Sequence, residues 1–298
     1  MLLFLLLHTL FQEPGDDVVL VEPEFKVDYE ERVVLVDLPL KVTRFGRPVT
    51  ELERSDLVIK ENGIEAEIRK LTQVQTELTV HLLLDLSTSN AEHIFQTKAA
   101  SRHLIKQLKK GDQAKVSYFS NTYQELSDYT DDQDFLLKKL SRVTPIGSTA
   151  LYDGLSAALD QLSEVSGSRV LFLFSDGHDL MSGTTEEELA TKVKNYRIPI
   201  FMVSFKASGK ELPPLLAEQR QFMSDLVRDS GGHLFLGNTQ FQNDLTQAMR
   251  QTRTRFLINY TSPNTSNGQT WRSIMATHKS CADCYLEYRR GYELSSTN

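Results

Sequence analysis

The fold is decided by the stretch Leu82-Leu83-Leu84-Asp85-Leu86-Ser87-Thr88-Ser89. A short apolar run of this kind is typical of a strand buried on both faces, as in a parallel sheet covered by helices. Side chains alternate along an extended chain, so a segment continuing beyond the strand would direct Asp85, Ser87 and Ser89 to one side. The stretch therefore predicts a buried parallel strand with three oxygen-bearing side chains at its carboxyl end.

Apolar strands alternate with amphipathic helices on the carboxyl side of this stretch, as far as about residue 255. Thr185 with Glu188 and Thr130 with Gln133 have the spacing of capping boxes, which start helices. This alternation predicts an α/β domain over residues 76–255 with a Rossmann-like, doubly wound and mostly parallel sheet. Further strands are expected at residues 116–119, 170–174, 200–204 and 234–236, and helices at about 94–110, after the expected caps Thr130 and Thr185, from about 151 and 214, and before about 254.

Strand patterns flank this α/β domain at both ends. Residues 33–42 largely alternate between apolar and polar, and Asn62-Gly63 is a strong hairpin signal between two short strands. Three further strands are expected within residues 256–288. Because three strands are too few for a stable domain, we expect residues 16–75 and 256–298 to combine into one β-sandwich that carries the α/β domain as an insertion. Two separate hairpin appendages packed on the α/β domain are the alternative.

Two other polar loops occupy equivalent places in the pattern. Gly147-Ser148-Thr149-Ala150 precedes a helix, and Ser175-Asp176-Gly177 follows the expected strand at residues 170–174. Functional groups of open α/β sheets gather at the carboxyl ends of the strands. We therefore expect one site that contains the side chains of Asp85, Ser87, Ser89, Thr149 and Asp176.

The chemistry of these five side chains indicates a metal ion. Two carboxylates and three hydroxyls, without His or Cys, are hard oxygen ligands, which suit Mg²⁺ better than zinc or copper. Mn²⁺ and Ca²⁺ are the alternative ions. Because the protein supplies only two negative charges and neutral hydroxyls fill the rest of the coordination sphere, the ion keeps positive character, and a Glu or Asp of a partner protein is the expected further ligand.

The three-part pattern of Asp85-x-Ser87-x-Ser89, Thr149 and Asp176 resembles the metal-ion-dependent adhesion site of von Willebrand factor A domains. The resemblance covers about residues 77–254 and implies binding of an acidic ligand through Mg²⁺. The flanking runs Ser55–Gly63 and Arg289–Tyr292 resemble the bacterial subgroup described as von Willebrand factor A-related proteins of acidobacterial type. This sequence departs from the family at Thr88 and Asn90, where members commonly carry Gly and Met, so the packing of the loop is expected to differ.

Alternative interpretations of the site belong to other functional classes. A turn capped by hydroxyls would explain Asp85, Ser87 and Ser89 alone, but not the matching positions of the other two residues. A phosphatase acting through Asp85 generally needs a second Asp two residues later, where this chain has Ser87. A serine hydrolase would need a G-x-S-x-G motif, which the chain lacks. His178 is expected as a loop residue at the rim of the site.

Composition restricts the partners. The chain has 33 Lys and Arg against 40 Asp and Glu, a formal charge of −7, and no long basic run, which argues against nucleic acid and anionic membranes. The apolar run Met1–Phe11 is shorter than the roughly 20 residues of a spanning helix, and residues 1–15 resemble a signal peptide without the usual basic start and cleavage site. An exported protein is expected; a misplaced start codon or a loosely anchored N-terminal helix is the alternative.

The chain has two cysteines, Cys281 and Cys284. This lone C-x-x-C lacks a second pair for zinc and a following βαβ unit of the thioredoxin type. A small disulfide across a turn between two strands is expected in an exported protein, and two free thiols are the alternative.

The sequence therefore predicts a non-enzymatic, Mg²⁺-dependent protein-binding module, with an intracellular scaffold or assembly factor as the alternative. The oligomeric state and the identity of the partner do not follow from it.

Overall fold

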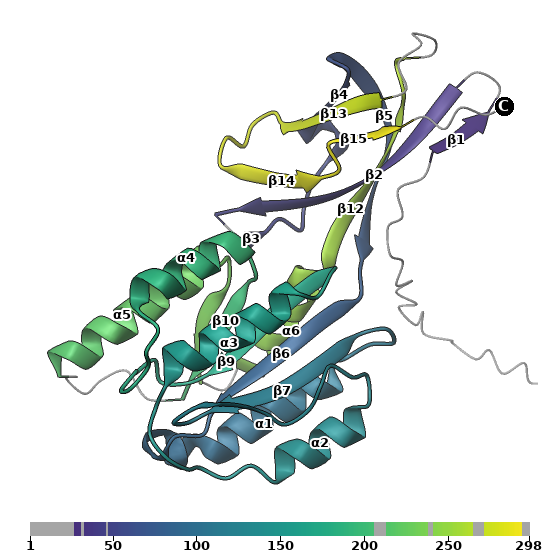
Figure 1. Cartoon of the computed structure of the whole chain (residues 1–298). Coiled ribbons are helices and arrows are strands. Elements are labelled where there is room, and N and C mark those ends of the chain that lie inside the picture. Colours follow the sequence, from purple (N-terminus) through teal and green to yellow (C-terminus); the bar gives the residue numbers. More distant parts are fainter. Residues whose placement is uncertain are drawn as a thin grey trace, which may run out of the picture.

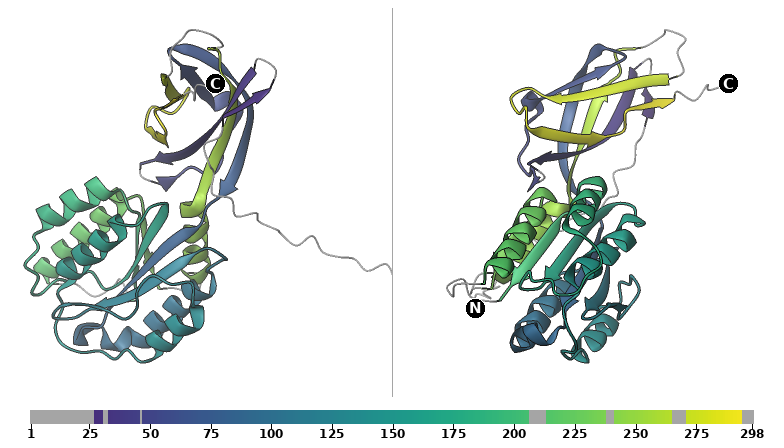
Figure 2. Two further views of the ribbon diagram at one scale, coloured as in Figure 1. Left: turned by 45° about the vertical axis from the view of Figure 1, so that its right-hand side comes forward. Right: turned by 60° about the vertical axis from the view of Figure 1, so that its left-hand side comes forward.

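The computed structural model describes residues 27–30, 33–45, 47–205, 213–237, 241–264 and 271–293. Two domains follow one another along the long axis of the molecule (Figure 1). One is an α/β domain with helices on both faces of a sheet, and the other is a curled β-domain that contains both ends of the described chain (Figure 2). The expected signal-peptide-like segment, residues 1–15, lies outside the described residues.

The α/β domain contains a sheet of six described strands. Neighbouring strands are parallel except for the edge strand β8, which pairs with β7 in the antiparallel sense. The predicted mostly parallel sheet is confirmed, although the sequence analysis missed β8. Their order is β11 (His233–Leu236), β10 (Ile200–Ser204), β9 (Ser168–Phe174), β6 (Leu78–Asp85), β7 (Gln113–Phe119) and β8 (Tyr123–Glu125).

Helices cover both faces of this sheet because each buries one apolar stripe against it. One face carries α1 (Ile94–Lys106), α2 (Gln133–Ser141) and α6 (Phe241–Arg253). The other face carries α3 (Leu151–Ser163), α4 (Glu186–Tyr196) and α5 (Pro214–Asp229). The strands between them are almost fully buried, as the apolar stretch at residues 82–84 predicts.

The predicted helix starts are partly correct. Thr185 and Glu188 form the expected capping box at the start of α4. The N-cap of α2, however, is Asp132, whose carboxylate accepts a hydrogen bond from the Phe135 amide at 2.9 Å. Thr130 instead forms a backbone bridge with Ala114, which draws it into the edge of the sheet. The predicted cap at Thr130 is therefore wrong.

The β-domain is an antiparallel sheet of nine described strands that curls on itself. Strand β12, from the carboxyl part of the chain, lies between β2 and β5, from the amino part. The two ends therefore share one core, which confirms the inserted sandwich and excludes two separate appendages. The strands are β1 (Val27–Glu30), β2 (Val33–Arg44), β3 (Arg47–Pro48), β4 (Leu57–Glu61), β5 (Ile64–Gln75), β12 (Thr254–Thr261), β13 (Trp271–His278), β14 (Cys284–Tyr288) and β15 (Gly291–Glu293).

The two chain crossings between the domains lie side by side. Strand β5 ends and β12 begins at the paired residues Gln75 and Thr254. Beside them the Arg253 guanidinium donates two hydrogen bonds to Asp112, at 3.0 and 2.8 Å, and both side chains are buried. A bidentate pair of this kind fixes geometry as well as charge, so it holds the end of α6 to the base of the sheet.

Cys281 and Cys284 are bonded through their sulfur atoms in the turn that leads from β13 into β14. These strands do not form a hairpin with one another: β13 pairs with β4 and β15, whereas β14 pairs with β2. The disulfide therefore closes the turn at the start of β14 and does not join two paired strands. Among the described residues, no helix is both long and apolar enough to cross a membrane.

Candidate metal centre

Three loops meet at the carboxyl edge of the sheet. Strands β6 and β9 are parallel neighbours with Leu84 opposite Phe174, so Asp85 and Ser175 leave the sheet side by side. The loop before α3 is bonded to the loop after β6, because the Thr88 amide donates to the Gly147 carbonyl at 3.1 Å. The topology thus brings together the three segments that the sequence analysis selected.

Four of the five predicted residues form a continuous chain of oxygen contacts. The Ser87 hydroxyl donates to Asp85 Oδ1 at 2.5 Å and lies 2.9 Å from the Ser89 hydroxyl. Ser89 Oγ lies 3.3 Å from Thr149 Oγ1. Asp85, Ser87 and Thr149 are buried. The hydroxyls therefore converge at one place beside a buried carboxylate.

The fifth predicted residue, Asp176, follows β9 and is also buried. Its Oδ1 accepts from the His178 amide at 3.3 Å, and its Oδ2 lies 3.4 Å from His178 Nδ1. His178 is a loop residue, as expected, and its side chain is buried beside Asp176. Ser175, which the sequence analysis gave no role, donates its hydroxyl to Asp85 Oδ2 at 2.9 Å.

The environment of Asp85 disfavours the ionised form of its carboxyl group. Burial raises the pKa of Asp85 to about 6, hydrogen bonds from Ser87 and Ser175 oppose this rise, and the negative charge of Asp176 adds to it. The Asp85 carboxylate accepts hydrogen bonds from neutral groups, the Ser87 amide and the Ser87 and Ser175 hydroxyls. A divalent cation would favour the ionised carboxylate, and the oxygen donors present fit a hard ion such as Mg²⁺.

The described residues contain no cluster of three or more His, Cys, Asp or Glu side chains of the kind that holds a metal. The predicted site has only two carboxylates, and its other three donors are hydroxyls, so a cluster of that kind would not include it.

The two residues at which the loop departs from the family pattern both stabilise it. The Thr88 hydroxyl donates to the Gly147 carbonyl at 2.9 Å, and the Asn90 amide donates to the Asp85 carbonyl at 3.2 Å. Thr88 thus ties two of the three loops together. Asn90 fixes the backbone at the residue whose carboxylate is central to the site.

Gly147 is required by its conformation. It has φ +76°, and a Cβ atom there would lie 2.6 Å from Asn121 Oδ1. Asn121 Oδ1 also accepts a hydrogen bond from the Ser148 amide at 2.6 Å. Asn121 therefore positions the loop that carries Thr149, a role for which the sequence offers no local signal because 27 residues separate Asn121 from Ser148.

Exposed apolar side chains lie next to these oxygen groups along the chain. Ile146 is 60% exposed, Leu180 60% and Met181 49%. Leu180 is held close to the site because its amide donates to the Thr149 carbonyl at 2.9 Å. Three exposed apolar side chains on loops that surround a polar centre are typical of a surface that contacts a partner.

Comparisons with known proteins agree with this geometry. Residues 80–178 match the family model of the von Willebrand factor type A domain, a range that includes all five predicted ligands. A search of curated proteins found no significant match.

Several solved structures are similar to parts of the chain. The protein BatB from Bacteroides thetaiotaomicron is 14% identical over 59% of this chain and 98% of its own, with a TM-score of 0.47. A von Willebrand factor type A protein from Catenulispora acidiphila is 10% identical over 88% of this chain and 74% of its own, with a TM-score of 0.49. The corresponding domain of the type V pili tip protein Mfa5 from Porphyromonas gingivalis is 12% identical over 59% and 93%, with a TM-score of 0.45.

Proposed function

Because the α/β domain is a von Willebrand factor type A domain, matched over residues 80–178, we propose that the chain is a non-enzymatic, Mg²⁺-dependent protein-binding module. The hydroxyls of Ser87, Ser89 and Thr149 and the carboxylates of Asp85 and Asp176 would hold the ion. Mn²⁺ and Ca²⁺ are the alternative ions, since they also prefer oxygen ligands.

The observation that carries this proposal is the chain of contacts from Asp85 through Ser87 and Ser89 to Thr149. Hydroxyls neutralise no charge, so only the two carboxylates offset the charge of a divalent ion. When bound, the ion supplies a positive centre at the protein surface. A carboxylate of a partner is the group that such a centre would attract most strongly.

The surroundings of the site favour a protein as the partner. Ile146, Leu180 and Met181 would contact apolar groups next to the partner's acidic residue. Apolar contact gives affinity, while the single charged contact fixes the register of binding. The β-domain would serve as the stalk that presents this surface.

The same contacts argue against the phosphatase alternative. A general acid would have to stand two residues after Asp85, and that residue is Ser87, whose hydroxyl already donates to the Asp85 carboxylate. A serine hydroxyl does not lose or gain a proton near neutral pH, so it supplies no acid or base for phosphoryl transfer. We therefore retain the binding function and no catalytic one.

Titration of the wild-type protein and Asp85→Ala with Mg²⁺ in a calorimeter tests the metal site. Binding heat is expected for the wild type and none for Asp85→Ala. Asp128→Ala is the matched control, because the Asp128 side chain is 99% exposed and lies outside the site. Equal heat for Asp85→Ala and the wild type, or no heat for either, would overturn the proposal.

We propose export as the location and an intracellular scaffold that uses the same site as the alternative. Cell fractionation, together with sequencing of the mature N-terminus, distinguishes them. A pull-down in Mg²⁺ and again in EDTA would then isolate the partner; a protein captured equally under both conditions would not be the ligand of the metal site.

A further inference from the structure

A cavity of about 670 Å³ lies between the two domains, far along the molecule from the metal centre. Helix α4, the residues after it and the end of α5 form one wall, and strands β2 and β14 form the other. Sites for small molecules commonly have volumes of about 300–1,000 Å³ and often lie at domain interfaces. The junction cavity meets both conditions.

The α/β wall of the junction cavity contains four apolar residues among polar ones, which include Glu187, Lys194 and Asp229. Val193 and Leu226 are almost fully buried side chains of the α/β core that also face the cavity, and Ala190 and Pro199 lie beside them. The β-domain adds Pro48. An aliphatic group that entered here would leave water for an apolar surface, which is favourable by about 25 cal/mol per Å² of area removed from water.

Lys41 lines the other wall, and it also lines a neighbouring pocket of about 560 Å³ that contains Arg255. The Lys41 side chain is only 18% exposed, and its one ion-pair partner in the described part of the chain, Glu287 Oε2, is 3.9 Å away on a side chain that is 64% exposed. Burial and the nearby Arg255 lower the pKa of Lys41 to about 8, while Glu287 opposes this change. Lys41 therefore carries a poorly compensated positive charge.

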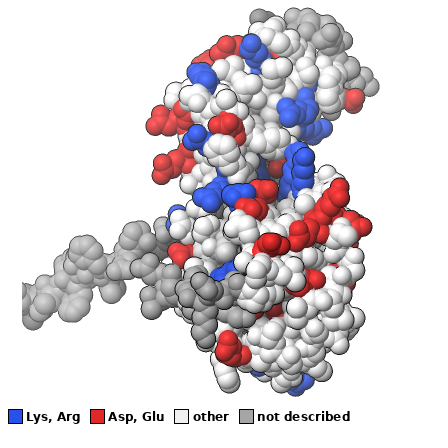
Figure 3. All heavy atoms as spheres, turned by 90° about the vertical axis from the view of Figure 1, so that its left-hand side faces the viewer, with Lys and Arg blue, Asp and Glu red and all other residues white. Residues whose placement is uncertain are grey.

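Arg255 and Arg169 lie near Lys41 outside the lining of the junction cavity, which itself combines the cations Lys41, Lys194 and Arg197 with the carboxylates of Glu187, Asp229 and Glu287. The Arg255 guanidinium donates to the carbonyls of Thr252 and Thr254, and that of Arg169 donates to Leu162 and Ser163. These acceptors are neutral, so neither guanidinium is neutralised by them. Basic side chains gather at the waist between the domains on the face shown in Figure 3.

The cavity has a defined shape because a contact between the domains closes one side. The Arg197 guanidinium lies over the Tyr285 ring, 4.7 Å from its centroid, and donates to its hydroxyl. Arg197 follows α4 and has a left-handed backbone with φ +52°, just before the chain enters β10. A side chain from each domain thus forms this edge.

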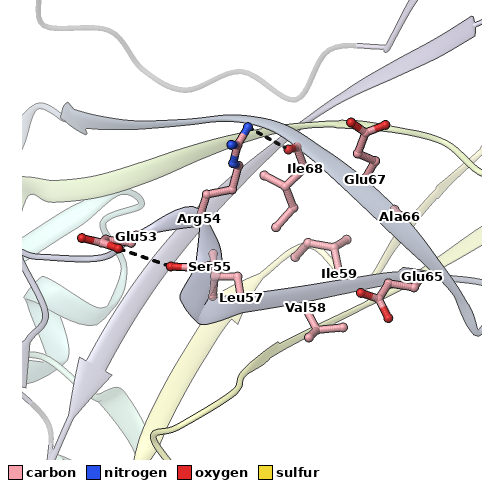
Figure 4. A pocket seen from close by; sticks show the side chains of 10 residues that line it. All are labelled: Glu53, Arg54, Ser55, Leu57, Val58, Ile59, Glu65, Ala66, Glu67 and Ile68. Atoms are coloured by element: carbon pink, nitrogen blue, oxygen red, sulfur yellow. Dashed lines mark hydrogen bonds between the residues drawn. The ribbon is translucent and has the colours of Figure 1, made fainter.

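A second groove, between β4 and β5, lacks these properties (Figure 4). Its volume is about 430 Å³, and the acidic residues Glu53, Glu65 and Glu67 line it. Its one lining cation, Arg54, already donates to the carbonyls of Ile68 and Arg69. The groove therefore offers neither a free cation nor an apolar wall of comparable extent.

We propose that the junction cavity is a second binding site, for a small apolar molecule that carries one carboxylate. The carboxylate would pair with the Lys41 ammonium, and the aliphatic part would lie on Val193 and Leu226. This site is independent of the metal centre and does not rest on the function proposed for it. An occupant would contact both domains at once and would stabilise their present arrangement.

Calorimetric titration of the full chain with octanoate, octylamine and inorganic phosphate tests this proposal. Octanoate is expected to bind, whereas octylamine has the wrong charge and phosphate lacks the aliphatic part. Lys41→Met keeps the length of the side chain without its charge and should weaken octanoate binding at least tenfold. Lys60→Met, at an exposed position of β4, is the matched control and should bind as the wild type does.

A cavity-filling variant guards against an effect of Lys41 on folding. Ala190 is exposed on α4 where it lines the cavity, so Ala190→Phe should fold normally and still exclude octanoate. Asp85→Ala should bind octanoate as the wild type does. Absence of octanoate binding to the wild type, equal binding of octylamine, or unchanged binding by both Lys41→Met and Ala190→Phe would each overturn the proposal.

Discussion

Each domain buries a carboxylate among hydroxyl groups, and the two clusters differ in what surrounds them. In the β-domain, Glu61 is fully buried and accepts hydrogen bonds from Tyr260 at 2.9 Å, Tyr292 at 3.0 Å, Ser262 at 2.5 Å and Asn264 at 3.0 Å. Every donor points at the carboxylate, and each comes from a segment far from it in the sequence. The cluster is closed, because its acceptor capacity is filled from within the protein.

Asp85 is also supplied with donors, from Ser87 and Ser175. Here, however, the hydroxyls of Ser89 and Thr149 approach the same place, and Asp176 adds a second buried carboxylate at the same sheet edge. Three hydroxyls and two carboxylates from separate loops therefore converge at this edge of the sheet. Burial alone does not distinguish the two carboxylates; the convergence of oxygen atoms from separate loops at the carboxyl ends of parallel strands does.

The largest expected effect follows from opening the closed cluster. Glu61→Ala should lower the free energy of unfolding by about 4 kcal/mol or more, since four buried donors lose their acceptor and each unsatisfied donor costs roughly 1–3 kcal/mol. Fluorescence of Trp271, the single tryptophan, reports unfolding of the β-domain in urea because it lies on β13.

The matched change at the open cluster should behave differently. In EDTA, Asp85→Ala should alter stability by less than about 1 kcal/mol, because loss of its hydrogen bonds is offset by removal of a charge that burial disfavours. Circular dichroism, which reports the helices of the α/β domain, provides the measurement. Equal destabilisation by the two variants would remove the distinction between the clusters.

Removal of Mg²⁺ should give the next largest effect. A ligand present at 100 times its Kd stabilises the folded state by about 2.7 kcal/mol, so the wild type in saturating Mg²⁺ should exceed the wild type in EDTA by about this amount. Asp85→Ala should show no difference between the two conditions. Glu61→Gln should retain the full difference, because the closed cluster plays no part in metal binding.

The open cluster could be predicted from the sequence and the closed one could not. Asp85, Ser87 and Ser89 are local in sequence, and the rule that functional groups gather where parallel strands end supplied the other two positions. Glu61 and Tyr292 both lie in quoted flanking runs, but their contact joins residues 231 apart, and no local pattern encodes it. The same holds for Asn121, which positions the Thr149 loop, and for the junction cavity, which depends on how the domains pack.

The buried side chain of His81, which lies outside the proposed metal site, should make the stability of the α/β domain depend on pH. This residue of β6 is fully buried, its Nε2 lies 2.7 Å from Ser117 Oγ, and burial lowers its pKa to about 3. In the unfolded chain the pKa of this histidine is about 6.5, so it takes up a proton at a higher pH there than in the folded protein. Stability is therefore lost as the pH falls below about 6.5. From pH 7 to pH 5 the loss should be about 2 kcal/mol.

Urea unfolding of the wild type and His81→Gln at both pH values, followed by circular dichroism, measures this loss. The pH dependence should shrink by about that amount in the variant, whatever the variant's own stability. An unchanged pH dependence would show that a group other than His81 causes the loss of stability.

The smallest effects come from a matched pair of hydroxyls, Ser262 and Ser87, each of which donates to its carboxylate at 2.5 Å. Ser262→Ala should lower stability by about 1–2 kcal/mol without changing Mg²⁺ binding, because it removes one donor from a closed set. Ser87→Ala should cost about 1 kcal/mol or less in EDTA and weaken Mg²⁺ binding about tenfold, because it removes a ligand. The two hydroxyls donate hydrogen bonds of the same length, so a difference in Mg²⁺ binding between the variants would come from the proposed metal site around Ser87. A Ser262→Ala variant with weakened Mg²⁺ binding would contradict this assignment.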